Sequence, residues 1–205
     1  MTKQKNRIHD LVKERYGDIA KGSSSGCALA CCGGSPSLVN IVNIGKALDY
    51  ADEDLLLAPG EANLGLGCGN PVGIARLKEG EIVLDLGSGA GFDAFLAAKS
   101  VGKTGKVIGV DMTPEMVEKA KENAERLNFS NVEFRLGEIE RLPVQDNSVD
   151  VVISNCVINL SQDKPSVFRE VYRILKPGGR VSISDILRSG EIPQEIRDDP
   201  AAYTG

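Results

Sequence analysis

VLDLGSGAG, residues 83–91, is the stretch that decides the fold of this 205-residue chain. A short apolar run leads directly into three closely spaced glycines, Gly87, Gly89 and Gly91. Glycine adopts the positive φ angles of a tight turn at little cost and lets the backbone approach a ligand closely. The stretch therefore predicts a buried strand that ends in a ligand-binding turn before a helix, as in doubly wound α/β sheets.

Apolar runs rich in valine and isoleucine alternate with amphipathic helices from Glu81 onward, which is the pattern of a doubly wound α/β sheet. The expected strands are Ile82 to Gly87, Lys106 to Asp111, Val132 to Gly137, Val149 to Asn155 and Arg180 to Asp185. The expected helices between them are Gly91 to Lys99, Pro114 to Leu127 and Pro165 to Leu175. Thr113 before Pro114 predicts an N-cap and a proline in the first helical turn.

Residues 1–77 predict a helical cap with cysteine-containing loops, set before a domain of residues 78–205. Helices are expected from Gln4 to Ala20 and from Ser37 to Tyr50. Between them lies a glycine- and serine-rich loop, Gly22 to Pro36, which cannot sustain a helix or a strand. Its cysteines are Cys27, Cys31 and Cys32, and because a simple spacer needs no thiols the loop is a candidate lid.

The composition argues against several classes of partner. The chain has 24 Lys and Arg residues against 29 Asp and Glu residues, a formal net charge of -5, so its field repels phosphate backbones and anionic membranes. We therefore expect neither nucleic acid nor a membrane as partner. The charged N-terminus lacks the apolar core of a signal peptide, which favours a cytoplasmic chain whose five cysteines are thiols.

Two acidic residues indicate what the glycine turn binds. The spacing G-x-G-x-G differs from the G-x-G-x-x-G of nicotinamide enzymes. Asp85, just before the turn, would repel a pyrophosphate but could accept hydrogen bonds from an ammonium group. Asp111, at the end of the next strand, could accept both hydroxyls of a ribose. The pattern predicts a nucleoside cofactor with a cationic amino-acid part.

The segments that follow resemble the class I methyltransferases. They are the runs Gly137 to Glu140, Leu142 to Val144, Val149 to Val152 and Leu175 to Arg180, and the resemblance extends from Leu77 to Leu187. It implies a Rossmann-like sheet with S-adenosylmethionine as the cofactor. The methionine end of the cofactor would lie at Asp85 and the glycines, and its nucleoside would lie at Asp111. The cofactor-binding residues that it implies are Asp85, Gly87, Ser88, Gly89, Asp111, Met112, Ile139, Glu140 and Asn155.

The substrate is indicated by a missing base and a well-placed thiol. Methyl transfer to oxygen or nitrogen usually needs a base near the methyl group. The single histidine, His9, lies on a charged helix and is expected to be exposed and inert. A substrate with its own lone pair would need no base. Cys156 follows the fourth strand, whose end faces the ligand crevice of such a sheet.

Five stretches resemble the arsenite methyltransferases specifically. They are Asn63 to Pro71, Leu84 to Ala98, Ile108 to Met116, Phe134 to Val144 and Ser154 to Lys164. The resemblance implies that thiolates of Cys68 and Cys156 hold trivalent arsenic with a third, more C-terminal cysteine. It also implies that Cys31 or, preferably, Cys32 handles the incoming thiol-bound arsenical. Soft thiolates suit this soft centre. The implied partners are arsenite or its glutathione conjugate and a thiol reductant.

Several alternatives stay open at this stage. The chain could methylate a small organic molecule, or it could bind arsenic or another soft metal without catalysis. Zinc held by Cys27, Cys31, Cys32 and Cys68 is a weaker alternative, because their spacing is a poor match to paired C-x₂-C hooks. A complete class I sheet has two further strands, and the family's third cysteine would follow AAYTG at the end of this chain. We therefore expect an incomplete sheet and weak or absent catalysis.

Overall fold

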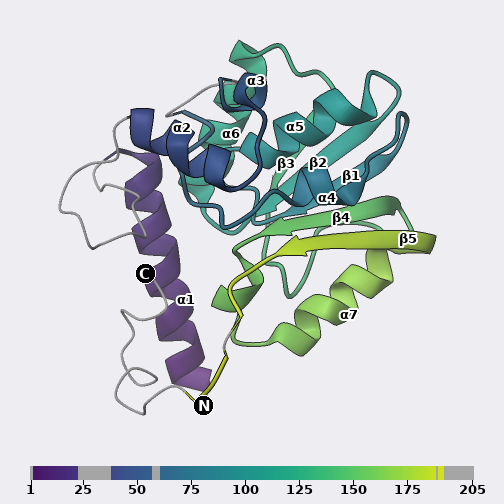
Figure 1. Cartoon of the computed structure of the whole chain (residues 1–205). Coiled ribbons are helices and arrows are strands. Elements are labelled where there is room, and N and C mark those ends of the chain that lie inside the picture. The colour runs from purple at the N-terminus through teal and green to yellow at the C-terminus, as the bar shows by residue number, and fades with distance from the viewer. Residues whose placement is uncertain (1, 23–37, 57–60, 188, 192–205) are drawn as a thin grey trace.

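A computed structural model describes residues 2–22, 38–56, 61–187 and 189–191. Its centre is a five-stranded parallel sheet in the order β3-β2-β1-β4-β5 (Figure 1). The strands are β1 Ile82–Leu86, β2 Lys106–Asp111, β3 Val132–Leu136, β4 Val149–Asn155 and β5 Leu175–Ser184. The helices that connect them are α5 Phe92–Val101, α6 Pro114–Arg126 and α7 Lys164–Ile174, with a 3-10 turn at Ile158–Leu160. The predicted doubly wound α/β class is confirmed.

Both faces of the sheet are buried, as expected for parallel strands connected by helices. Alternate residues of β1 contribute to two cores: Val83 packs with α5 and α6, whereas Leu84 and Leu86 pack with α7. Because the side chains of a strand alternate between faces, Asp85 shares the face of Val83. Figure 1 shows α7 on one side of the sheet and α5 on the other.

Within the described residues, four helices precede the sheet, and they are α1 Thr2–Ala20, α2 Leu38–Ala47, α3 Asp52–Leu55 and α4 Pro71–Ala75. Ile19 packs with Met116 of α6, and Tyr50, just after α2, packs with Leu96 of α5. In Figure 1 the arrowheads of β4 and β5 point toward α1, so this helix stands at the carboxyl ends of the strands. None of these helices, nor any other in the described ranges, is long and apolar enough to cross a bilayer.

The structure corrects one expectation about local geometry. The fifth strand begins at Leu175 instead of Arg180, because Leu175 already pairs with Val149 of β4 before an irregularity in the ladder. The glycine-rich segment around Cys68 lies between two short helices, α3 and α4. The second of these is capped by the side chain of Asn70, which accepts a hydrogen bond of 2.8 Å from the Gly73 amide.

Thr113 is the N-cap of α6, as predicted, although its side chain makes no capping hydrogen bond. The loop that carries Cys27, Cys31 and Cys32 lies outside the described residues, as does most of the chain after β5. The prediction of a cysteine-bearing lid and of a sheet that is incomplete at its end therefore stays a prediction.

The core on the α5 side should dominate stability. Phe95 is fully buried and contacts Phe129 and Phe134 at centroid distances of 5.0 and 5.7 Å. Phe95→Ala should lower the free energy of unfolding by about 3–5 kcal/mol, measured by urea denaturation. Tyr172→Ala, at a side chain that is 83% exposed, is the matched control and should change it by less than about 0.5 kcal/mol. Equal losses in the two variants would contradict this assignment of the core.

Candidate active site

A cavity of about 420 Å³ lies at the carboxyl ends of β1, β2 and β4, between the sheet and the cap. The side chains that close it from the cap include Val12 and Tyr16 of α1 and Ile41 of α2. Every residue that the sequence predicted for cofactor binding lines this cavity. They are Asp85, Gly87, Ser88, Gly89, Asp111, Met112, Ile139, Glu140 and Asn155. The structure thus brings the set together, and the individual contacts with a cofactor stay predictions.

The glycine turn has the geometry that its sequence predicts. Gly87, Gly89 and Gly91 have φ angles of 65°, 51° and 98°, all in the region that favours glycine. A Cβ atom on Gly87 would collide with the side chain of Val157, so the turn packs closely on the segment after β4. A Cβ atom on Gly89 would meet nothing within 4 Å. Gly89 therefore leaves open space for a ligand beside the backbone.

Asp111 fixes the turn to the end of β2. One carboxylate oxygen accepts a hydrogen bond of 2.9 Å from the Gly89 amide, and the other accepts one of 2.8 Å from the Thr113 amide. Burial raises the pKa of Asp111, although these hydrogen bonds oppose the rise. The carboxylate has lone pairs left over, so it can shape the turn and still accept a ligand hydroxyl.

Asp85 is the buried group most in need of a partner. Its side chain is 2% exposed, and its Oδ2 atom has no hydrogen-bond donor among the described residues. Burial, reinforced by the nearby carboxylates of Asp93 and Asp111, raises the pKa of Asp85 well above its usual range. An unpaired buried carboxylate is costly unless a donor or a cation meets it. An ammonium group of a ligand would satisfy this oxygen.

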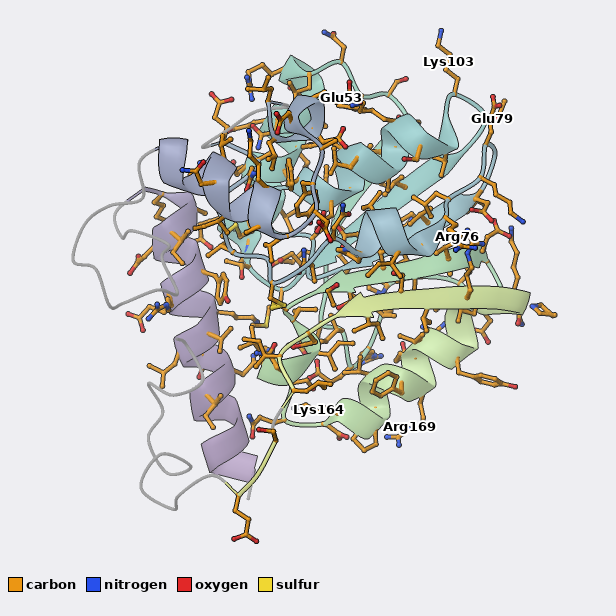
Figure 2. The ribbon with its side chains drawn as sticks, in the orientation of Figure 1. Glu53, Arg76, Glu79, Lys103, Lys164 and Arg169 are labelled. Carbon is orange, nitrogen blue, oxygen red and sulfur yellow. A yellow bond between two sulfur atoms is a disulfide. The ribbon has the colours of Figure 1, made fainter. Side chains whose placement is uncertain are left out.

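The wall of the cavity is strongly acidic. Of the described residues that line it, six are acidic and one, His9, is basic. Near the amino ends of β1 and β2, side chains of both positive and negative charge, such as Lys103 and Glu79, extend outward from the ribbon (Figure 2). Field lines from the acidic wall are concentrated in the cavity, so the cavity favours a cationic ligand.

His9 departs from the prediction that it is exposed. Its side chain is 29% exposed, and its Nε2 lies 3.6 Å from the Glu138 carboxylate at the rim of the cavity. Farther along the rim, Ser161 donates a hydrogen bond of 2.5 Å to Glu140. His9 thus lies beside Glu138, next in sequence to the predicted cofactor-binding residues Ile139 and Glu140.

Cys68 and Cys156 meet, as their shared role requires, but they form a disulfide. This corrects the expectation that all five cysteines are thiols. The cause is proximity, since their Cα atoms are 5.8 Å apart, within the usual range for disulfides. Cys156 lines the cavity, whereas Cys68 approaches it from the loop before α4. Cys32, the third predicted thiol, lies outside the described residues.

The sequence reasoning missed Tyr50 and Asp93, which both line the cavity and join Asn155 in one hydrogen-bonded network. A signal for Asp93 was present, because it is the one acid in the otherwise apolar run from Phe92 to Ala98. An acidic residue on the buried side of a helix indicates a partner. Nothing in the sequence pointed to Tyr50, which lies between two short elements.

The residues that line the cavity fit S-adenosylmethionine. The unpaired oxygen of Asp85 suits its ammonium group, the acidic wall suits its positive charge, and the space beside Gly89 admits a ligand chain. Asp111 lies at the neighbouring strand end, where its carboxylate could accept hydrogen bonds from the hydroxyls of a ribose.

Comparison with known proteins gives a consistent result. Residues 77–205 match the family described as Methyltransferase domain. Over 96% of its length the chain is 50% identical to an arsenite methyltransferase of Halobacterium salinarum, of which it spans 51%. It therefore covers about half the length of the curated relatives that it matches.

Two solved structures are similar as well. An arsenic(III) S-adenosylmethionine methyltransferase from Chlamydomonas reinhardtii is 41% identical with a TM-score of 0.61, over 82% of this chain and 55% of that chain. A SAM dependent methyltransferase from Aquifex aeolicus is 30% identical with a TM-score of 0.55, over 76% of this chain and 79% of that chain.

Asp111→Ala should weaken binding of S-adenosylhomocysteine by about 1–3 kcal/mol, through lost hydrogen bonds to a charged acceptor. Isothermal titration calorimetry measures this change. Asp150→Ala is a matched control, since this carboxylate also accepts from a backbone amide, that of Ile82, but lies at the far end of β4. It should leave the affinity unchanged. Equal affinity in the Asp111 variant and the native chain would show that Asp111 does not bind the cofactor.

Binding of S-adenosylmethionine should depend on pH through Asp85. The ammonium group pairs with the ionised carboxylate, so binding should lower the raised pKa of Asp85 and release protons. Affinity should therefore fall as the pH drops below that raised pKa, toward the ordinary value of 3.8. Calorimetry in buffers of different ionisation enthalpy measures the protons released. Asp85→Asn should remove most of the release, and an unaltered release in this variant would contradict the assignment.

Proposed function

This chain belongs to the methyltransferase-domain family, and on that premise we propose that it transfers the methyl group of S-adenosylmethionine to trivalent arsenic held by its own thiolates. The observation that carries the proposal is the meeting of Cys68 and Cys156 at the edge of the acidic cavity. Their Cα atoms, 5.8 Å apart, place two soft ligands where one ion can bridge them.

The arsenic ligands must first be reduced. A disulfide has no thiolate to offer, so two electrons and two protons from a thiol reductant have to open the bond between Cys68 and Cys156 before arsenic binds. A third thiolate completes the pyramidal shell of trivalent arsenic, supplied by Cys32 or by a bound thiol such as glutathione. We accordingly propose arsenite or its glutathione conjugate as substrate, and the cytoplasm, where thiols are kept reduced, as the compartment.

Each side of the site contributes a different chemistry. When bound, S-adenosylmethionine supplies a methyl group on a positively charged sulfur, which the acidic wall complements. Asp85 and Asp111 are proposed to orient its amino-acid and ribose parts, and the paired cysteines to hold the acceptor at the end of β4. Trivalent arsenic has its own lone pair, so no side chain has to remove a proton. This agrees with a cavity whose basic lining residue among those described, His9, lies beside the Glu138 carboxylate.

Coverage favours arsenic over an organic acceptor. The methyltransferase match is confined to residues 77–205, whereas the similarity to arsenite methyltransferases covers 96% of the chain, including the cysteine-bearing segments before the sheet. The cap residues are thus part of the resemblance. Methylation of an organic acceptor would not account for the similarity of the cap residues to arsenite methyltransferases, nor would it use the two cysteines, Cys68 and Cys156.

Reduced chain should bind As(III) with a stoichiometry of one, and Cys68→Ser or Cys156→Ser should weaken that binding about a hundredfold, because the second thiolate acts at high effective concentration. Equilibrium dialysis with elemental analysis measures the bound arsenic. The oxidised chain is the control and should bind far less. If a variant with both Cys68→Ser and Cys156→Ser bound As(III) as tightly as the native chain, the arsenic site would be wrongly assigned.

Methyl transfer separates the proposed function from its alternatives. Reduced chain with glutathione should transfer labelled methyl groups from S-adenosylmethionine to arsenite only slowly, in keeping with the weak catalysis expected from its sequence, and the Cys68→Ser, Cys156→Ser double variant should transfer none. Chromatography of the labelled products measures the transfer. Transfer to an organic acceptor by the double variant would instead identify an organic methyltransferase. As(III) binding without any transfer would identify a binding module.

A further inference from the structure

The amide of Asn155 ties the Cys68 loop to the end of β4. Its Oδ1 accepts a hydrogen bond of 2.9 Å from the Cys68 amide, and its Nδ2 lies 2.8 Å from the carbonyl oxygen of Gly69. Asn155 immediately precedes Cys156, the other half of the disulfide. The Cys68 loop is therefore held at two consecutive residues, by hydrogen bonds to the side-chain amide of Asn155 and by the disulfide to Cys156.

Tyr50 and Asp93 hold that amide in place. The Tyr50 hydroxyl lies 2.7 Å from one Asp93 oxygen and 2.9 Å from the carbonyl oxygen of Gly69, either of which can accept its proton, and the other Asp93 oxygen accepts from Asn155 Nδ2 at 2.9 Å. Asn155 Nδ2 also lies 3.1 Å from the Tyr50 hydroxyl, so its two protons serve three neighbouring acceptors. Tyr50 is only 7% exposed and packs on Phe92. The amide orientation is thereby fixed from α5 and from the segment after α2.

The glycines beside Cys68 permit this close approach. A Cβ atom on Gly67 would lie 2.6 Å from Asn155 Nδ2, and one on Gly69 would lie 2.5 Å from the Ser184 hydroxyl. The loop is thus pressed against the ends of β4 and β5 on both sides of Cys68. These contacts join the Cys68 loop to β4 and β5 separately from the sulfur–sulfur bond.

We propose that Asn155, oriented by Tyr50 and Asp93, is a positioning residue that keeps Cys68 beside Cys156 when their disulfide is open. Its role in arsenic binding rests on the proposed function, but the pairing of the two thiols does not require arsenic. Because its amide groups are engaged with the protein, Asn155 acts on the cysteine pair, and its contact with the cofactor stays a prediction.

Thiol–disulfide exchange with glutathione measures the pairing directly. Two glutathione molecules reduce the protein disulfide to two thiols and leave as one glutathione disulfide, so the equilibrium constant reports how closely the open thiols are held together. Asn155→Ala should shift this equilibrium about tenfold toward the dithiol, because the loop loses its hydrogen-bonded anchor. Affinity of the reduced chain for As(III) should fall by a similar factor.

A matched variant separates positioning from general stability. Asn131→Ala removes an amide that also donates to two carbonyl oxygens, those of Ala98 and Gly102, but lies away from the cysteines. It should leave the equilibrium unchanged. An unchanged equilibrium in Asn155→Ala, or an equal shift in the two variants, would overturn the proposal.

Tyr50→Phe provides a second test that keeps the aromatic packing. Loss of the hydroxyl should shift the glutathione equilibrium in the same direction, by about threefold, and it decides the matter alone if Asn155→Ala does not fold. No shift would then overturn the proposal. Native chain that fails to bind As(III), together with the expected shifts in the two variants, would reject the proposed function and leave the positioning role standing.

Discussion

The site depends on the position of β1 between β2 and β4 in the parallel sheet. The chain crosses from β1 to β2 on one side and reaches β4 on the other, so the connections diverge and leave a crevice at the carboxyl ends of the strands. The residue pairing shows this directly. Leu86, the last residue of β1, pairs with Val110 of β2 and with Ser154 of β4. The ends of three strands therefore meet, and their terminal side chains form one wall.

This convergence has an electrostatic cost. Asp85, Asp93 and Asp111 are brought together in the interior, where burial raises the pKa of each. The protein compensates two of them internally, Asp111 with backbone amides and Asp93 with Tyr50 and Asn155. Among the described residues, Asp85 keeps an oxygen without a donor. This carboxylate lines the cavity, so a cationic ligand that met it would gain affinity from a group that destabilises the empty protein.

Sequence alone predicted the sheet and the cofactor wall because both follow from local patterns. The apolar runs located β2 and β4 to the residue, and the glycines and the acids at the strand ends marked one side of the cavity. The Tyr50–Asp93–Asn155 network was not predictable in this way, since its members are 43 to 105 residues apart and meet only in the folded chain. The disulfide was missed for a different reason: the family resemblance implied a shared role for Cys68 and Cys156, but the expected reducing compartment predicted both as thiols.

The two halves of the site use opposite kinds of chemistry, and their arrangement explains why they do not interfere. Hard carboxylates gather around the glycine turn, whereas the soft sulfurs lie beyond Asn155, at the end of β4. A cationic cofactor would be attracted to the first group and, under the proposed function, trivalent arsenic to the second. Between them stands an uncharged amide whose polar atoms are engaged with the protein. An aspartate in place of Asn155 would extend the acidic wall to the cysteines and disfavour their thiolates, so a neutral residue at this position suits both halves.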